Sequence, residues 1–298
     1  MTGRRKFVTL SGLAIGGCLG VGWPALATGI NKTKESASVQ ARLAALEAGV
    51  GGRLGVAILD TESGRQWAYR AAERFAMCST FKLLAAAALL KRVDTGSEHL
   101  ERRIVYRRDM LLAYSPTTGQ HVGGEGLSLA QLCEAMVTLS DNTAANLVLD
   151  SLGGLAPFNA FVRSLGDTVT RLDRNEPKLN SAVPGDLRDT TMPAAMTANL
   201  HKLLLGDVLS NASRQQLTAW LVANQTGDKR VRAGVPANWT VGDKTGTGDF
   251  GSTNTVAIIW PPQRQPILAS LYLTQTKAPP AQREAVLADI GRMLAEIL

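Results

Sequence analysis

Segments with the composition of β-strands lie near both ends of this 298-residue chain, and the middle of the chain is mostly helical. The strand-like segments are residues 53–60 and 65–69 before the helical part, and residues 239–246, 253–260 and 267–274 after it. Strands that lie so far apart in sequence can share one sheet when the intervening chain forms a lobe of its own. The pattern therefore predicts an α+β fold: an antiparallel sheet flanked by terminal helices, with an inserted all-α domain.

The predicted boundaries divide the chain into three parts. Residues 1–27 are expected to be an export signal. Residues 35–72 and 222–298 form a discontinuous α/β domain, with helices at 38–48 and 281–298, and residues 73–221 form the all-α domain. The middle part contains two stretches without a helical period, at residues 114–126 and 172–193, which we expect to be loops.

The first 27 residues have the organisation of an export signal. Paired Arg4 and Arg5 precede a glycine-rich apolar run that is too short to span a bilayer, and Ala25-Leu26-Ala27 provides a small-x-small cleavage site. The paired arginines resemble a twin-arginine signal, a general Sec signal is the alternative, and Cys18 leaves lipoprotein processing open. We expect a periplasmic or secreted mature protein, cleaved near Ala27 and not attached to a membrane.

The charge and histidine patterns argue against several functions. Removing the three cations of the signal from the formal charge of +7 leaves +4, and no Lys/Arg stripe with interleaved aromatic residues suggests nucleic-acid binding. His99, His121 and His201 lack metal-ligand spacing, and no G-x-S-x-G elbow of an α/β-hydrolase is found. We therefore expect no metal and no cofactor.

Ser79-Thr80-Phe81-Lys82 begins a segment of strong helix formers, which places Ser79 at the start of a helix. The free N–H groups and the dipole at a helix start favour a developing oxyanion. Lys82 lies on the same helix face, and burial would lower its pKa enough to make it a base. Because S-x-x-K occurs by chance about once in a chain of this length, the motif alone identifies nothing.

Three further segments could converge on Ser79. Ser140-Asp141-Asn142 precedes a helix and could simply be its N-terminal cap. Lys244-Thr245-Gly246 ends a strand and could simply be an exposed edge. The segment RNEPKLN, residues 174–180, has neither a helical nor a strand period. The prediction of a site depends on finding all of these in this order.

In this order, STFK, SDN, EPKLN and KTG resemble the class A serine β-lactamases, and so do the longer segments RLDRNEP and RDTTMPAAM. The resemblance runs from about residue 35 to the C-terminus. It implies an α/β domain and an all-α domain with the active site in the cleft between them. It also implies a monomeric hydrolase whose only partner is a small-molecule β-lactam.

The resemblance implies a chemical role for each motif. Ser79 attacks the β-lactam carbonyl and forms an acyl-enzyme, while the backbone N–H groups of Ser79 and Thr247 hold the oxyanion. Either Lys82, or Glu176 acting through a water, takes the Ser79 proton. Ser140 returns a proton to the ring nitrogen.

The substrate-binding residues follow from the same resemblance. The strand after KTG reads GSTNTVAII and contains no arginine, so Arg230 is expected to supply the cation that binds the substrate carboxylate. Tyr114 either lines the cleft or is an ordinary packing tyrosine. The full set is Asn142, Asn180, Lys244, Thr245, Gly246, Thr247, Arg230 and Tyr114.

The loop that contains Glu176 distinguishes a hydrolase from its rivals, because an acyl-enzyme that lasts defines a penicillin-binding protein. Hydrolysis needs a held water and a carboxylate that deprotonates it, and Glu176 with Asn180 can supply both. The resemblance also implies a cis Glu176–Pro177 peptide bond, an Arg174–Asp189 ion pair at the neck of the loop, and Asn146 as its support.

The resemblance leaves both remaining cysteines, Cys78 and Cys133, without their usual disulfide partners. Those partner positions are occupied by Ala86 and Gly248. We therefore expect two buried, free thiols.

The expected function is hydrolysis of penicillins and cephalosporins, with oxyimino-cephalosporins and carbapenems left open. The alternatives are a peptidoglycan D,D-peptidase and a β-lactam sensor that stays acylated. Glu176 argues against the peptidase, and the lack of an anchor and a signalling domain argues against the sensor.

Overall fold

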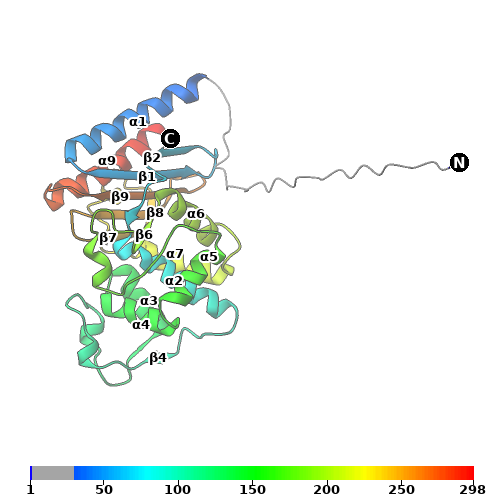
Figure 1. The fold of residues 1–298 in the computed structure, drawn as a ribbon, viewed down its shortest axis with the longest axis vertical. Coiled ribbons are helices and arrows are strands. Elements are labelled where there is room, and N and C mark those ends of the chain that lie inside the picture. Colours follow the sequence, from blue (N-terminus) through cyan, green and yellow to red (C-terminus); the bar gives the residue numbers. More distant parts are fainter. Residues whose placement is uncertain (2–29) are drawn as a thin grey trace.

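The computed structural model describes Met1 and residues 30–298, so the rest of the predicted export signal, with Arg4, Arg5 and Cys18, lies outside the described residues. A five-stranded antiparallel sheet has helices on both faces (Figure 1). Its order is β2-β1-β9-β8-β7. The strands are β1 (Arg53–Asp60), β2 (Gln66–Tyr69), β7 (Thr240–Thr247), β8 (Thr253–Trp260) and β9 (Ile267–Thr274). Both ends of the chain build one sheet, as predicted, because β1 pairs along its whole length with β9.

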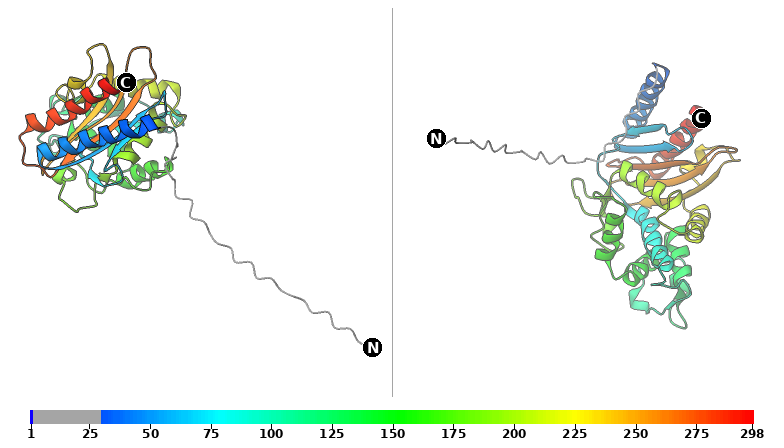
Figure 2. Two further views of the ribbon diagram at one scale, coloured as in Figure 1. Left: turned by 90° about the horizontal axis from the view of Figure 1, so that it is seen from above. Right: turned by 90° about the vertical axis from the view of Figure 1, so that its right-hand side faces the viewer.

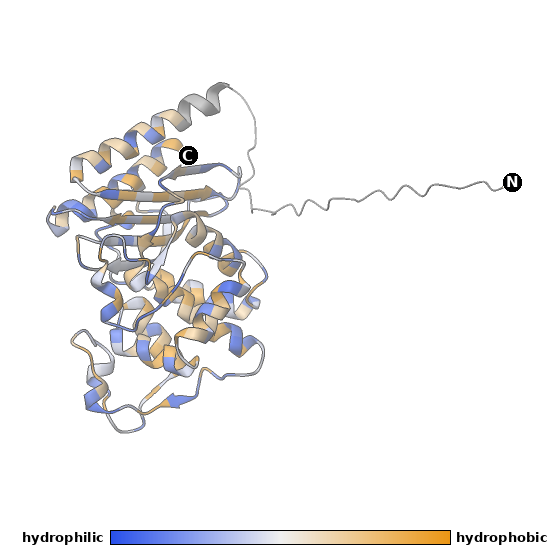
Figure 3. Ribbon diagram, viewed as in Figure 1, coloured by the Kyte–Doolittle hydropathy of each residue, from blue (hydrophilic) through white to orange (hydrophobic). Residues whose placement is uncertain are grey.

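The central strands are buried on both faces. All residues of β9 and all but the last of β8 are buried, which explains their nearly continuous runs of apolar and small side chains. Figure 3 shows hydrophobic residues along the strands of the sheet. The sheet therefore forms part of two cores, one on each side.

Two terminal helices cover the outer face of the sheet. α1 (Ile30–Val50) and α9 (Pro280–Ile297) lie side by side across it (Figures 1 and 2). Leu43 of α1 and Leu287 of α9 are fully buried in this core. α1 begins earlier than predicted and ends at Val50, one residue beyond the expected glycine stop, because the left-handed terminating residue is Gly51 with a φ of 61°.

The second core lies between the inner face of the sheet and the helical lobe. α2 (Phe81–Asp94) runs through its centre and is buried from Phe81 to Leu90. The surrounding helices are α3 (Leu129–Thr138), α4 (Asn142–Ser151), α5 (Leu155–Ser164), α6 (Pro193–Leu204) and α7 (Asn211–Val222). The short α8 (Val231–Gly234) packs against α9 instead, and Val231 belongs to the outer core. The exact domain boundaries stay a prediction. Helix α6 falls in the sequence range of the predicted all-α domain, but it packs on the sheet, where Thr197 Oγ1 donates to the Ala57 carbonyl at 3.1 Å.

Short strands and 3₁₀ turns complete the fold. β3 (Phe75–Ala76) pairs with β6 (Thr190–Thr191), and β4 (Arg103–Ile104) pairs with β5 (Leu127–Ser128). The 3₁₀ turns are η1 (Cys78–Thr80), η2 (Arg108–Met110), η3 (Thr118–Gln120) and η4 (Lys178–Ser181). No helix in the described part of the chain is long and apolar enough to cross a membrane.

Candidate active site

Ser79 lies in the turn η1, directly before α2, with only 8% of its surface exposed. The sequence predicts a helix start here, and the structure replaces its first turn with a tighter 3₁₀ turn. The preceding residue, Cys78, has a left-handed φ of 46°, a conformation that non-glycine residues adopt at a cost and that often marks functional sites. Ser79 therefore stands at a strained corner at the N-terminal end of a long helix, where the dipole favours negative charge.

One carboxylate oxygen contacts both the serine and the lysine. Glu176 Oε1 accepts a hydrogen bond from Ser79 Oγ at 3.2 Å and lies 2.9 Å from Lys82 Nζ. The side chains of Lys82 and Glu176 are both fully buried, so each charge is stabilised chiefly by its partner and by nearby polar groups of the protein. Burial lowers the pKa of Lys82, and the neighbouring Glu176 carboxylate acts against this shift.

The Ser140 hydroxyl lies between two buried lysines. It accepts hydrogen bonds from Lys244 Nζ at 3.1 Å and from Lys82 Nζ at 3.3 Å. Lys82 Nζ also donates to the Ser140 carbonyl at 2.8 Å and to Asn142 Oδ1 at 2.7 Å. Burial, together with the charge of Lys82, holds the pKa of Lys244 well below its usual value. A proton can therefore pass between the lysines and this hydroxyl without any large movement.

The loop of residues 172–193 presents Glu176 from the opposite side. Asn146 clamps the Glu176 main chain with two hydrogen bonds of 3.0 Å, one to the carbonyl and one from the N–H. The Glu176–Pro177 peptide bond is cis, as predicted. Asn180 Nδ2 donates to Glu176 Oε2 at 2.5 Å, while Asn180 Oδ1 is buried and has no hydrogen-bond partner among the described residues. The loop thus places a carboxylate and a free acceptor next to each other.

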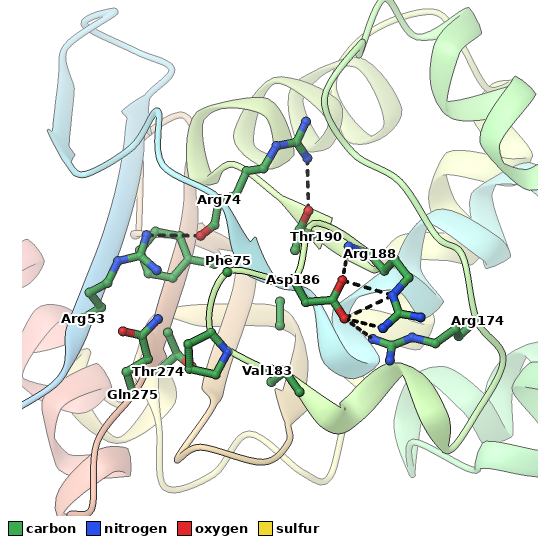
Figure 4. A pocket seen from close by; sticks show the side chains of 14 residues that line it. Arg53, Arg74, Phe75, Arg174, Val183, Asp186, Arg188, Thr190, Thr274 and Gln275 are labelled. Carbon is green, nitrogen blue, oxygen red and sulfur yellow. Dashed lines mark hydrogen bonds and ion pairs between the residues drawn. The ribbon is translucent and has the colours of Figure 1, made fainter.

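The neck of this loop is tied by the predicted ion pair. Arg174 Nε donates to Asp189 Oδ2 at 2.5 Å, and Asp189 Oδ1 accepts from the N–H groups of Asp173 and Arg174 at 2.7 and 2.9 Å. Asp189 is fully buried. Figure 4 shows a second link, in which Asp186 lies between Arg188 and Arg174. The Arg188 guanidinium lowers the pKa of Asp186 to about 2.

Arg230 lies behind the end of β7 and is 6% exposed. Its Nη1 donates to the carbonyls of Gly246 at 3.0 Å and Asn254 at 2.7 Å, and its Nη2 donates to Thr247 Oγ1 at 2.8 Å. The Glu284 carboxylate lies 3.7 Å from Nε. Burial lowers the pKa of Arg230. The Arg230 guanidinium therefore lies at the end of β7 and is bonded to Thr247, and its role in binding the substrate carboxylate stays a prediction.

These segments surround a hollow of about 290 Å³. The residues that line it are Ser79, Tyr114, Ser140, Asn142, Asn180, Thr226, Arg230, Thr245, Gly246 and Thr247. Tyr114 stands at its rim and is 52% exposed, which fits a cleft residue better than a packing tyrosine. Thr226 was not predicted: its hydroxyl lies 2.5 Å from that of Thr245, but a lone threonine in a loop carries no motif.

The two cysteines are buried and free, as expected. Cys78 packs against the end of β7, and a Cβ placed on Gly248 would lie only 2.6 Å from both Cys78 Sγ and the Asn180 carbonyl. Glycine at this position therefore lets the strand, the nucleophile turn and the loop meet closely. No group of three or more His, Cys, Asp or Glu side chains suited to a metal is found in the described part of the chain.

A serine that lines a polar hollow and contacts a buried glutamate, which in turn contacts a buried lysine, is the arrangement of a serine enzyme that works through a covalent acyl intermediate. Residues 38–298 match the family described as β-lactamase enzyme family. A β-lactamase from Citrobacter koseri is 48% identical over 262 residues, which cover 88% of this chain and 89% of the relative. β-Lactamase FAR-1 from Nocardia farcinica is 50% identical over 258 residues, covering 87% and 82%. The solved structure of an ancestral class A β-lactamase is 62% identical, has a TM-score of 0.86 and covers 87% of this chain and 100% of its own. The chain belongs to the β-lactamase enzyme family, in class A.

Proposed function

We propose that this class A β-lactamase hydrolyses penicillins and cephalosporins through an acyl-enzyme on Ser79 that Glu176 helps to hydrolyse. The observation that carries the proposal is the shared oxygen: Glu176 Oε1 contacts both Ser79 Oγ and Lys82 Nζ. This contact joins the nucleophile to both candidate bases within one hydrogen-bonded cluster.

In the acylation step, Ser79 Oγ attacks the β-lactam carbonyl, and the ring C–N bond then breaks. The negative charge that develops on the carbonyl oxygen is held by the N–H groups of Ser79 and Thr247, each worth about 3–4 kcal/mol in comparable sites. The sequence left Lys82 and Glu176 open as the base. The direct Ser79–Glu176 hydrogen bond favours Glu176 as the first acceptor of the proton.

The ring nitrogen needs a proton as it leaves. Ser140 can supply it, because its hydroxyl already accepts from Lys82 and Lys244, either of which can replace the proton that it gives up. The low pKa that burial imposes on both lysines makes this transfer easier.

Deacylation requires a water held against the ester. Asn180 contributes to this role through its buried Oδ1, which has no hydrogen-bond partner in the described part of the chain and belongs to the amide that contacts the Glu176 carboxylate. Glu176 deprotonates the water, which attacks the ester carbonyl and returns the Ser79 hydroxyl.

The substrate carboxylate would bind at the end of β7. Lys244, Thr245, Thr247 and Arg230 converge there, while Asn142 faces the side-chain amide of the substrate. Turnover of a penicillin, an early cephalosporin, an oxyimino-cephalosporin and a carbapenem, measured side by side, defines the substrate range.

The proposal includes export to the periplasm as a monomer, with cleavage near Ala27. N-terminal sequencing and the mass of protein recovered from the periplasm would test the cleavage site and exclude or reveal a lipid on Cys18. Light scattering would test the monomer.

Burst kinetics with a chromogenic cephalosporin test the central mechanism. We expect sustained turnover by the wild type, and we expect Glu176→Ala to stop after about one equivalent per enzyme. A burst of one equivalent in both proteins would instead identify an acyl-trapping protein, either a D,D-peptidase or a sensor.

A further inference from the structure

The turn that carries Ser79 is held by hydrogen bonds within its own main chain and by one to the loop of residues 172–193. The Met77 carbonyl accepts hydrogen bonds from the Thr80 N–H at 3.2 Å and from Thr80 Oγ1 at 2.8 Å. The Met77 N–H donates to the Asp189 carbonyl at 2.9 Å. Because Cys78 is left-handed, this segment would relax toward a commoner conformation if its carbonyls were released.

Two side chains of the sheet also contact this turn: the Tyr272 hydroxyl of β9 lies 3.3 Å from Thr80 Oγ1, and Asn254 binds the carbonyls that precede Ser79. Asn254 of β8 is 1% exposed, and its Nδ2 donates to the Ala76 carbonyl at 2.9 Å and to the Met77 carbonyl at 3.1 Å. Both hydrogens of one amide are thus used on two consecutive carbonyls that lie just before the nucleophile. An aspartate or a leucine of similar shape could make neither bond.

The main chain of the same residue contacts Arg230 and strand β7, where the substrate carboxylate is proposed to bind. The Asn254 carbonyl accepts from Arg230 Nη1 at 2.7 Å, and the same nitrogen donates to Gly246, which is paired with Asn254 across the strands. A Cβ on Gly246 would lie 2.7 Å from the Met77 carbonyl, so strand β7 and the turn already touch. Asn254 therefore connects Arg230, β7 and the nucleophile turn.

We propose that Asn254 is a positioning residue for acylation: its amide fixes the Ala76–Cys78 turn so that Ser79 Oγ and the Ser79 N–H face the carbonyl of the bound substrate. The proposal rests on the assignment of Ser79 as the nucleophile. Before acylation only the turn aims Ser79 Oγ at the carbonyl, whereas in the acyl-enzyme the ester bond itself holds Ser79 against the substrate, so Asn254 acts mainly on the first step.

The test compares Asn254→Asp and Asn254→Leu with the matched control Thr255→Val. Thr255 is the next residue of β8, is fully buried, and its hydroxyl has no hydrogen-bond partner among the described residues. The control therefore disturbs the same strand without removing a contact. Stopped-flow measurement of a chromogenic cephalosporin and mass spectrometry of the acyl-enzyme give the acylation and deacylation rates separately.

We expect both Asn254 variants to slow acylation by about 10- to 100-fold while deacylation stays within about threefold of the wild type. Acylation at the rate of Thr255→Val, or an equal loss in both steps, would overturn the proposal. If those variants do not fold, Asn254→Ser keeps one donor and should acylate at an intermediate rate; acylation at the wild-type rate would contradict the role.

Ser79→Ala, measured in parallel, separates this inference from the proposed function. A covalent adduct in Ser79→Ala would show that the nucleophile is misassigned, and the inference would fall with it. If no adduct forms there and the Asn254 variants acylate like the control, only the role of Asn254 is wrong.

Discussion

Replacing Asp189 with asparagine should loosen the neck of the catalytic loop. The carboxylate is fully buried and accepts three hydrogen bonds, one of them from Arg174 at 2.5 Å. Asparagine keeps one acceptor, but it turns an N–H₂ toward the Arg174 donor and removes the charge. Breaking a buried ion pair from one side costs about 3–5 kcal/mol.

The expected loss is smaller than that, because Arg174 can find other partners. Its side chain is 18% exposed, and Asp186 lies 3.6 Å away. We therefore expect Asp189→Asn to lower the free energy of unfolding by about 2–3 kcal/mol, which corresponds to a fall in Tm of about 4–10 °C. Deacylation should slow by about tenfold or more, because Glu176 and Asn180 lie on the loop that the pair anchors.

Thermal and urea unfolding measure the first effect, and single-turnover kinetics with a chromogenic cephalosporin measure the second. Asp109→Asn is the matched control, since Asp109 is also paired with an arginine but is exposed, with 65% of its side chain accessible. It should change neither quantity. If Asp189→Asn unfolds at the same temperature and urea concentration as the control, the buried pair does not stabilise the loop and the reasoning is refuted.

Three smaller predictions follow from other contacts. Gly248→Ala should slow deacylation about tenfold, because its Cβ would force the Asn180 carbonyl away from a 2.6 Å contact; an unchanged single-turnover rate would contradict this. Since Arg188 lowers the pKa of Asp186 from 3.8 to about 2, the pair stabilises the fold fully above about pH 4 and loses this effect as the pH falls toward 2. The Tm difference between wild type and Asp186→Asn should shrink over that range, and a constant difference would argue against the pair. Thr255→Val should leave the free energy of unfolding unchanged or raise it by up to about 1 kcal/mol, because it removes a buried hydroxyl that has no hydrogen-bond partner within the described residues; a clear loss of stability in urea would contradict this.

The sheet could be predicted closely because its strands are bounded by strong local signals. Segments 53–60, 253–260 and 267–274 match β1, β8 and β9, each set off by turn residues or by charged ends. The start of α1 could not be predicted, because the sequence of its first residues, INKTKE, has no apolar stripe. The order of the strands was not predicted either, since it depends on pairing between distant segments and not on any local pattern.

Motifs predicted the candidate residues and some loop contacts, such as the Arg174–Asp189 ion pair, but not the contacts of the nucleophile. The S-x-x-K spacing places Lys82 beside Ser79, yet the hydrogen bond from Ser79 goes to Glu176, 97 positions away. The left-handed Cys78 has no sequence signal, because the surrounding structure imposes its conformation. Asn254 was missed for a related reason: an asparagine in a strand reveals nothing about which carbonyls the folded chain brings to it.

The pairing of β1 with β9 also determines when, during synthesis on the ribosome, the active site can first form. β1 ends at Asp60, and its longest partner, β9, begins at Ile267, so more than two thirds of the chain must be made between them. Contacts at such separation form slowly, because the loop must close before they stabilise anything. Until then β1 has only the short β2 beside it, and the β7–β8 hairpin cannot join the first strands through β9. Ser79 is therefore synthesised long before β7, which forms the opposite side of the active site. The site is complete only once β9 has joined the sheet, so we expect no activity before that step.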